Sequence, residues 1–364
     1  MTLFDRYLSR LWFANFLVVC AFSAGLIILQ DTYNYFLDMV GAQLNLLQIA
    51  EFFLLSTIVN FPTITPFAFF VSIIFTLTAL QKTEQITILK SCGLSLFRIS
   101  LSFWLMAILL SALTLFISST LIPKVSDARN AYIELCTQSL VEPEQERKKS
   151  TLTFQNAKSN RLWYIEHFDE YALKGGHSIL HQLNEAGVEI SRVVAQSSIY
   201  DQDLETWTFS NGTEIIFDSI TGDPLQSINF ESKQFIELEE DPKDYLLFYK
   251  ANKDLSPNEI KKLLSLIEEG TPQRQSYLTN YYSFYATPLL PLVFVGITFP
   301  FLTRGIRNNS LLDAMYPVGL FVLFFILKGV CSTLGQNLIL PALTSALLPY
   351  ALFLILVLKL FWKK

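Results

Sequence analysis

The chain has few charged residues and few cysteines for its length. Of its 364 residues 16% are charged and 51% are hydrophobic, a balance that excludes an ordinary soluble protein. The cysteines are scattered without a CxxC spacing, which argues against a disulfide framework and against a zinc site. They are Cys20, Cys92, Cys136 and Cys331. The composition therefore favours a membrane protein.

Motifs of nucleotide-driven and hydrolytic enzymes are also missing. No Walker A sequence, nucleophile elbow, HExxH or dinucleotide fingerprint occurs. We expect no catalytic residue and no cofactor in this chain, and if ATP drives it, a separate chain must bind the nucleotide. His177 and His181 would share one face of a helix and could ligate a metal. Because they follow Gly175-Gly176 in a β-rich region, we expect a strand or loop there and no metal.

Six apolar stretches are long enough to cross a membrane, since a hydrocarbon core of about 30 Å takes roughly 20 helical residues. They cover residues 11–29, 52–80, 99–122, 281–302, 315–333 and 340–358. The last two are divided at the turn signal "GQNLILP". A signal peptide is an alternative for the first stretch, because Arg6 and Arg10 precede it and small residues lie at 23–25. The apolar run continues past these small residues, which favours a span.

The basic residues beside the spans predict the orientation, because they concentrate on the cytoplasmic side. Six spans with an inside N-terminus place in the cytoplasm Arg6, Arg10, Lys82, Lys90, Arg98, Arg304, Arg307, Lys359, Lys363 and Lys364. The loop 30–51 then lies outside and contains Asp31, Asp38 and Glu51 but no Lys or Arg. Both termini are predicted to be cytoplasmic, and the polar block 124–275 extracytoplasmic.

That polar block has a composition of its own. It carries 26 acidic and 16 basic residues, whereas the rest of the chain carries 6 acidic and 11 basic ones. We therefore expect three parts: spans one to three in 1–123, an outer domain in 124–275, and spans four to six in 276–364. Four segments of the outer domain have β-branched and aromatic residues in partial alternation, which predicts strands. They are "LWYIEHF", "ISRVVAQSSIY", "TWTFSNGTEIIF" and "SINFESKQFIEL".

The strand pattern is compatible with an antiparallel sandwich, a roll or an open barrel. Two local signals add detail to this domain. Asn211-Gly212 between two strand-like runs predicts a hairpin turn. A helix over 257–269 should end the domain, because Ser256, Pro257 and Glu259 together form a helix start with a capping box. Its apolar stripe is expected to pack on the membrane surface or on the β domain.

The stretch "LQKTEQITILKSCGLSLFRIS", residues 80–100, gathers charge between spans two and three. Thr83 can cap a short helix over 83–93, with Glu84 in its first turn and Gly93 at its end. The residues alone allow two interpretations. The segment is either a solvated loop whose basic residues follow the positive-inside rule, or a helix that contacts a partner protein.

Several segments, in order along nearly the whole chain, resemble the lipopolysaccharide-export permeases of the LptF/LptG (YjgP/YjgQ) family. "TEQITILKSCGLSLFRI" is similar to the family's coupling segment, and "VVAQSSIYDQDLETWTF" to a pattern in its outer domain. "RYLSRLWFANF" at the start, Pro62 and Pro66 in span two, "LSPNEIKKLLSLIEEG" and "PLLPLVFVGITFPF" agree as well. The coupling residues carried over from this resemblance are Glu84, Gln85, Leu89, Lys90 and Gly93.

The resemblance implies six membrane helices with a periplasmic β-jellyroll between the third and the fourth. It implies an inner-membrane permease subunit, without enzymatic activity, in an ATP-driven complex that extracts lipopolysaccharide from the outer leaflet and serves outer-membrane biogenesis. The implied partners are a paralogous permease, a dimeric cytoplasmic ATPase and periplasmic bridge proteins, with no nucleic acid. Asp31 and Asp38 stand where many members carry basic residues. A phosphate clamp at that place is therefore not expected here.

Two lipid-contact hypotheses and one rival function complete the sequence-based interpretation. The first contact set is Trp207, Phe209, Ile215 and Phe217, which must bury their side chains against a lipid or in the domain core. The second is Lys328, the only charge inside a predicted span, which either snorkels or faces a cavity and binds lipid phosphates. The rival function is a membrane sensor or scaffold whose outer β domain binds a ligand.

Overall fold

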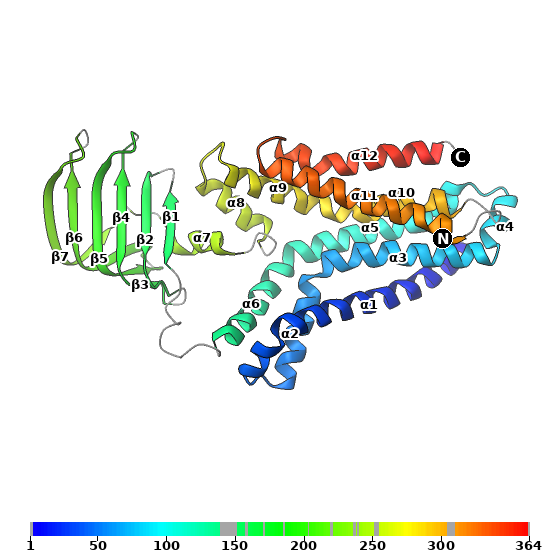
Figure 1. Ribbon diagram of the computed structural model, residues 1–364, viewed down its shortest axis with the longest axis horizontal. Coiled ribbons are helices and arrows are strands. Elements are labelled where there is room, and N and C mark those ends of the chain that lie inside the picture. The colour runs from blue at the N-terminus through cyan, green and yellow to red at the C-terminus, as the bar shows by residue number, and fades with distance from the viewer. Residues whose placement is uncertain are drawn as a thin grey trace. The chain divides into compact units, whose positions relative to one another are not determined.

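The division between apolar and polar sequence reappears as two compact units of the chain. The computed structural model describes residues 3–138, 151–156, 159–169, 172–184, 186–202, 204–218, 221–235, 238, 240–250, 255–303 and 310–362 (Figure 1). Unit 1 consists of Met1–Cys136 and Leu278–Lys364, and unit 2 of Thr137–Tyr277.

Helices form unit 1. They are α1 (Leu3–Gly41), α2 (Leu46–Val59), α3 (Phe61–Lys82), α4 (Gln85–Ser91), α5 (Leu96–Thr120), α6 (Ile122–Gln138), α9 (Pro272–Ala286), the 3-10 turn η2 (Thr287–Leu289), α10 (Leu290–Leu302), α11 (Ser310–Gln336) and α12 (Ala342–Trp362). The end of α6 and the start of α9 belong by sequence to unit 2. In the described part of the chain, six segments are long and apolar enough to cross a membrane. They lie on α1, α3, α5, the continuous α9–η2–α10 path, α11 and α12. The predicted membrane-helical class with six spans is confirmed.

The boundaries of the first two spans differ from the prediction. Helix α1 runs on to Gly41 instead of ending near residue 29, so most of the expected outer loop is helical. The predicted second span, 52–80, is divided at Asn60, which ends α2 and begins α3. Its side-chain amide donates to the carbonyl of Ser56 at 2.9 Å, and Pro62 occupies the first turn of α3. Hydrophobicity continues across this break, so periodicity alone did not reveal it.

The later spans agree better with their sequence signals. Pro288 lacks an amide hydrogen and falls in η2, which interrupts the fourth span between α9 and α10. The predicted division between spans five and six is confirmed, since α11 ends at Gln336 and α12 begins at Ala342.

Phenylalanine rings from three helices form the centre of unit 1. Phe70 on α3 stacks on Phe321 of α11 with ring centroids 4.5 Å apart, and Phe294 of α10 lies 5.2 Å from each of them. Helix α10 lies so close to α12 that a Cβ at Gly296 would meet Val357 at 2.5 Å. A small residue at this helix contact is what allows the close approach.

Unit 2 is built on one antiparallel sheet. Its strands are β1 (Leu152–Asn156), β2 (Arg161–Ile165), β3 (Lys174–Gly175), β4 (Ser178–Leu183), β5 (Glu189–Asp201), β6 (Thr206–Phe217) and β7 (Pro224–Phe235). The order along the sheet is β1-β2-β4-β5-β6-β7, with β3 paired to β5. The predicted β class is confirmed, whereas the jellyroll-like arrangement stays a prediction.

The predicted hairpin turn at Asn211-Gly212 is wrong. Strand β6 continues through both residues, although Asn211 has a left-handed φ of 50°, and keeps its register with β5 on either side, from Ser210↔Ser197 to Gly212↔Ala195. A Cβ on Gly212 would lie 2.6 Å from the ring of Phe230 and 2.7 Å from the carbonyl of Val194. The glycine therefore serves the close approach of β5 and β7 to β6 and not a reversal of the chain.

Aromatic side chains fill the core of unit 2, and short helices cover it. The largest buried side chains are Trp163, Trp207, Phe209 and Tyr245. Tyr245 comes from α7 (Pro242–Leu246), which continues into the 3-10 turn η1 (Leu247–Tyr249), and its ring stacks on Phe154 at 3.6 Å. Burial raises the pKa of the Tyr245 hydroxyl. Helix α8 (Pro257–Leu266) begins with the predicted Ser256–Glu259 capping box, which is confirmed.

Candidate functional site

The short helix α4 and its two connections form the first candidate site. The prediction that Thr83 caps α4 is wrong, because Thr83 ends α3 and its hydroxyl donates back to the carbonyl of Ala79 at 3.0 Å. Glu84 instead precedes α4 with a left-handed φ of 61°, and its side chain makes no capping bond. Left-handed backbone is rare for a residue with a Cβ. The chain therefore turns sharply at Glu84 and leaves the carboxylate exposed.

The end of α4 follows the predicted signal. Gly93 has a φ of +81°, its amide donates to the carbonyl of Lys90 at 2.9 Å, and the next amide, of Leu94, donates to Leu89 at 3.3 Å. These two bonds form a Schellman motif, for which glycine is the favoured residue. Ser95 then caps α5 by accepting a hydrogen bond from the amide of Arg98 at 3.2 Å.

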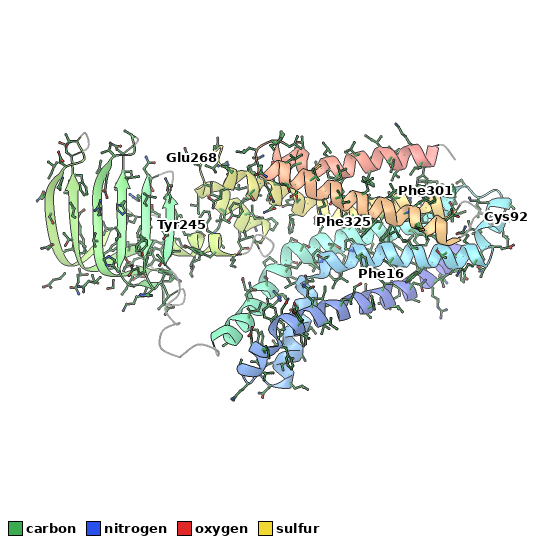
Figure 2. All side chains as sticks on the ribbon, viewed as in Figure 1. Phe16, Cys92, Tyr245, Glu268, Phe301 and Phe325 are labelled. Atoms are coloured by element: carbon green, nitrogen blue, oxygen red, sulfur yellow. The ribbon has the colours of Figure 1, made fainter. Side chains whose placement is uncertain are left out.

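Helix α4 has an inner face and an outer face. Ile86 is buried in the core of unit 1, and Leu89 packs partly against the same core. Outward lie Glu84, Thr87, Ile88, Ser91 and Cys92, with Ile88 exposed to 57%. Cys92 stands at the end of unit 1 where α4 lies (Figure 2). Of the five residues expected from the family resemblance, Leu89 and Lys90 thus point inward, and the outer face includes Thr87 and Ile88, which the sequence reading did not select.

Two polar contacts fasten the α4 region to the second half of unit 1. The Lys90 ammonium donates to the carbonyl of Thr303, the residue that ends α10. A cation at a helix C-terminus is favourable because the last carbonyls carry a partial negative charge. Burial lowers the pKa of Lys90. The amide of Gln81, near the end of α3, donates to Asp313 on α11 at 3.4 Å.

Two ion pairs join α1 to the α5–α6 segment at different levels, and only the second is buried on both sides. Near α4, Asp5 binds Arg98 and accepts a hydrogen bond from Ser102 at 2.9 Å. At the other level, Arg129 on α6 lies 3.7 Å from Asp31 on α1. The Arg129 guanidinium also donates to the Ser56 hydroxyl at 2.8 Å and lies 5.7 Å over the Phe52 ring. Asp31, which marked a departure from the family pattern, therefore neutralises an arginine from another helix.

Lys328 lies at the interruption of the fourth span. Its ammonium is 3.5 Å from the hydroxyl of Thr287 in η2, and the buried Tyr350 of α12 faces the same threonine. The proline in η2 removes an intrahelical hydrogen bond, so a polar side chain here lies beside incompletely paired backbone. The structure thus brings Lys328 next to η2, and its proposed contact with lipid stays a prediction.

The four aromatic and aliphatic residues proposed for lipid contact on β6 fall into two pairs. Trp207 and Phe209 are fully buried and pack on Trp163, with ring centroids 4.8 and 5.9 Å away. The Trp207 indole also donates to the carbonyl of Glu240 at 2.8 Å. Ile215 and Phe217 are only half-buried, and the Arg192 guanidinium lies 5.2 Å over the Phe217 ring. Only the second pair has side chains that a lipid could reach in this conformation.

The two histidines singled out by spacing lie on and beside a strand. His177 is exposed just before β4, whereas His181 on β4 hydrogen-bonds to the carboxylate of Glu189 at 2.6 Å. Within the described residues no group of three or more His, Cys, Asp and Glu side chains could hold a metal ion.

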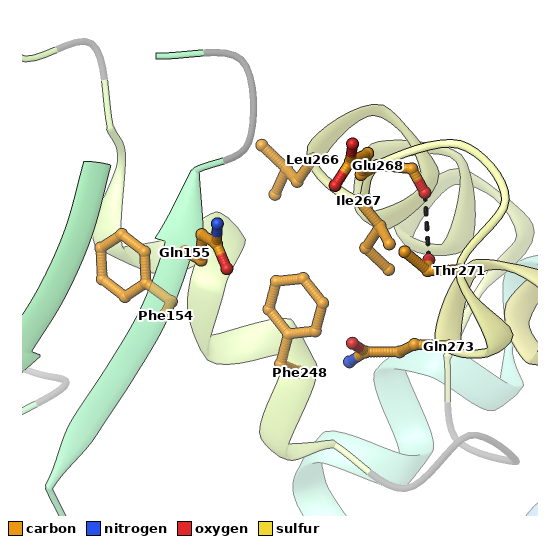
Figure 3. A pocket seen from close by; sticks show the side chains of 8 residues that line it. All are labelled: Phe154, Gln155, Phe248, Leu266, Ile267, Glu268, Thr271 and Gln273. Atoms are coloured by element: carbon orange, nitrogen blue, oxygen red, sulfur yellow. Dashed lines mark hydrogen bonds between the residues drawn. The ribbon is translucent and has the colours of Figure 1, made fainter. Parts of the chain in front are cut away.

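A pocket of about 230 Å³ lies within unit 2 between β1 and the end of α8. Its lining is half apolar and half polar: Phe154, Gln155, Phe248, Leu266, Ile267, Glu268, Thr271 and Gln273. Phe248, Leu266 and Ile267 point into the same space, and the Thr271 hydroxyl donates to the carbonyl of Glu268 at 3.0 Å (Figure 3). None of the residues selected from the sequence lines this pocket.

The two outer strands of the sheet differ in how open their edges are. The hydroxyl of Tyr249 accepts from the amide of Thr153 on β1 at 3.1 Å and lies 3.3 Å from the carbonyl of Thr151. Strand β7, at the other end of the sheet, extends over twelve residues, most of them exposed. A long exposed edge strand is a ready surface for pairing with a further strand, and charged or capped edges resist it.

A comparison with known protein families gives a match over nearly the whole chain. The family model described as "Lipopolysaccharide export system permease LptF/LptG" matches residues 6–363. No curated protein sequence matches the chain.

Proposed function

Because the chain belongs to the LptF/LptG family of lipopolysaccharide export permeases, we propose that it is the membrane subunit of an ATP-driven complex that moves lipopolysaccharide from the inner membrane to a periplasmic bridge. The family match, which runs through all six spans and the β-sheet unit, carries this proposal. A second, paralogous permease would complete the membrane part, and a dimeric ATPase would supply the energy. This chain itself would bind no cofactor.

In the proposed orientation both termini and α4 face the cytoplasm, and residues 124–275 face the periplasm as a jellyroll-like domain. The distribution of Lys and Arg beside the short loops supports this orientation.

The outer face of α4 would bind the ATPase. Glu84 offers a carboxylate to a basic residue of the partner, and the exposed Ile88 offers an apolar contact beside it. The inner face has a different role: it attaches α4 to the rest of unit 1, because Lys90 binds the end of α10 and Ile86 lies in the core. Movement of the ATPase would therefore pass from α4 into the fourth span through the contact between Lys90 and the end of α10.

The lipid would pass along unit 2 on side chains that remain accessible. Ile215 and Phe217 are the residues of β6 that we propose for this contact, while Trp207 and Phe209 would support the sheet from its core. The exposed edge of β7 is the surface we propose for strand pairing with a bridge protein.

Lys328 keeps a proposed role near the lipid path within the membrane. Its ammonium at η2 would move towards a lipid phosphate when the interrupted fourth span shifts, since a charge of this kind in a span commonly marks a substrate path. Lys328→Glu should reduce lipid capture while the complex with the ATPase still assembles. Normal export by Lys328→Glu would exclude a phosphate contact at this residue.

The function as a whole is tested by photocrosslinking in living cells. A photoreactive amino acid at Phe217 should crosslink to lipopolysaccharide in an ATP-dependent manner, whereas the same group at the buried Trp207 should not. Purification of the complex should recover an ATPase with the chain. Recovery of a kinase instead of an ATPase, with no lipid crosslink at Phe217, would favour a sensor or scaffold.

A further inference from the structure

The pocket of unit 2 between β1 and the end of α8 has one wall that hydrogen bonds hold in place. This wall is the turn between α8 and α9. In it the Thr271 hydroxyl donates to the carbonyl of Glu268 at 3.0 Å, and the Arg274 guanidinium donates to the carbonyl of Ile267 at 2.9 Å. Gly270 in the same turn has a φ of +85°, which glycine adopts without strain. A ligand therefore meets a wall that is already formed.

The opposite wall comes from β1 and η1, which are joined to each other. The Tyr249 hydroxyl accepts a hydrogen bond from the amide of Thr153 at 3.1 Å, so η1 is fixed against β1. Phe248, the residue before Tyr249, lines the pocket with its ring (Figure 3). Gln155 is exposed, whereas its neighbour Phe154 is buried in the core. Because successive side chains of a strand point to opposite faces, Gln155 lies on the pocket side of β1.

The volume of the pocket fits a single ring. It measures about 230 Å³, whereas an apolar cavity of about 150 Å³ is enough to bind benzene. The space therefore admits one six-membered ring together with its substituents, and it is too small for a larger ligand to enter completely.

The lining combines an apolar side with neutral polar groups. The Phe248 ring and the aliphatic side chains at the end of α8 form the apolar side. The amides of Gln155 and Gln273 lie on either side of this ring in Figure 3. A hydrogen bond with the Tyr277 hydroxyl orients Gln273, and each amide carries donors as well as an acceptor. A sugar ring matches this lining, since C–H groups cover its faces and hydroxyl groups surround its edge.

The charge of the lining disfavours an anion. Of the eight described residues that line the pocket, Glu268 is the charged one, and it is exposed. The nearby Arg274 is engaged with the carbonyl of Ile267 and the carboxylate of Glu269. A phosphate group would meet like charge here, whereas a neutral sugar or an amino sugar would not.

We propose that this pocket binds one sugar ring of lipopolysaccharide, with Phe248 against a face of the ring and the amides of Gln155 and Gln273 at its hydroxyl groups. The inference deepens the proposed function and rests on it. It assigns the sugar part of the transported lipid to a site of its own, separate from the side chains of Ile215 and Phe217 that we propose for lipid contact.

Saturation-transfer NMR tests the chemistry on the full-length chain, purified with its bound subunits and placed in lipid nanodiscs. The probes are methyl glucopyranoside, glucosamine and glucose 1-phosphate, and the first two should receive more saturation than the phosphate. Gln155→Trp fills the space and should abolish the transfer. Gln273→Leu should weaken binding about three- to tenfold, the effect of one lost hydrogen bond. Gln234→Trp, at an exposed position of β7, is the matched control and should change nothing.

Three results of this titration would overturn the proposal. They are strongest transfer to glucose 1-phosphate, transfer to the sugars that Gln155→Trp leaves unchanged, and no transfer to any sugar. Stronger transfer to N-acetyltyrosinamide than to both sugars, lost in Gln155→Trp, would assign the pocket to a protein side chain and would overturn it as well.

Photocrosslinking in living cells tests whether the sugar belongs to lipopolysaccharide. A photoreactive amino acid at Glu268 should crosslink to lipopolysaccharide, and Gln155→Trp should abolish this crosslink while the crosslink from Phe217 persists. A crosslink from Phe217 with none from Glu268 would overturn the inference and leave the proposed function standing. An equal crosslink from Glu268 in Gln155→Trp would place the sugar outside the pocket, which contradicts the inference too.

Discussion

Arg98, at the start of α5, binds Asp5, in the first turn of α1, through two nitrogen–oxygen contacts of 2.9 and 3.0 Å. The Asp5 carboxylate is buried and also accepts from Ser102. Because an uncompensated buried charge is costly, each single reversal, Asp5→Arg or Arg98→Asp, should lower the melting temperature of the protein in nanodiscs. The double reversal should regain part of that loss, and Arg6→Ala, at an exposed position, serves as the control. Equal melting temperatures for the single and double variants would contradict the pairing.

Substitutions on the outer face of α4 should affect binding of the ATPase, and substitutions on its inner face should affect export without affecting that binding. Glu84→Ala and Ile88→Lys change exposed side chains and should reduce recovery of the ATPase with the chain. Lys90→Met removes the ammonium from the Thr303 carbonyl, so the ATPase should still be recovered while export falls. Lys82→Ala, an exposed neighbour on α3, is the matched control. If Lys90→Met lost the ATPase as readily as Ile88→Lys, the division of the two faces would be wrong.

The contact between α10 and α12 should tolerate no side chain at Gly296. A Cβ there would lie 2.5 Å from a methyl group of Val357, and overpacking of this kind costs about 1–3 kcal/mol. Gly296→Val should therefore unfold at a lower denaturant concentration than the natural protein. Gly319→Val on α11 is the control, because nothing lies within 4 Å of its Cβ position. An unchanged midpoint for Gly296→Val would show that the two helices can move apart freely.

Residues of β6 should divide into core and surface when they are truncated. Trp207→Ala and Phe209→Ala remove fully buried rings, a change that costs about 3–5 kcal/mol in protein cores. Unit 2 should become sensitive to protease in both variants. Phe217→Ala should leave protease resistance unchanged and weaken lipid crosslinking from neighbouring positions. Protease sensitivity of Phe217→Ala equal to that of Trp207→Ala would place Phe217 in the core as well.

Low pH should reduce the stability of unit 2, because it protonates the carboxylate of Glu189. The hydrogen bond from Arg192 holds the pKa of Glu189 below its ordinary value, and the bond from His181 acts in the same direction against the effect of burial. A carboxyl group with a lowered folded pKa adds stability above the unfolded value of about 4.3, and this stability disappears as the pH falls through the folded value. Denaturant unfolding followed by tryptophan fluorescence should show the loss below about pH 4. Arg192→Ala should show a smaller loss than the control Lys174→Ala, and equal losses would exclude this pair as its cause.

Much of the architecture could be predicted because its signals are local. Each apolar run was long enough to span a membrane, the turn at 335–341 divided the last two spans, and Gly93 ended α4 in a Schellman motif. The capping box of α8 also depends only on residues within one helical turn. Local signals failed where a neighbour in space decided the outcome. Asn211-Gly212 looked like a turn, but the glycine accommodates the Phe230 ring of the adjacent strand.

The sequence by itself determined that this chain has six segments long and apolar enough to cross a membrane, carries a β-sheet unit between the third and the fourth, and belongs to a lipopolysaccharide export family. Hydrophobic length, strand alternation and short capping motifs are properties of consecutive residues, so no partner is needed to read them. Only the tertiary structure decided that Lys90 holds α10, that Arg129 neutralises Asp31 and that Trp207 lies in a core. Each of these outcomes depends on side chains brought together from distant parts of the chain, and the local pattern around one residue does not contain them.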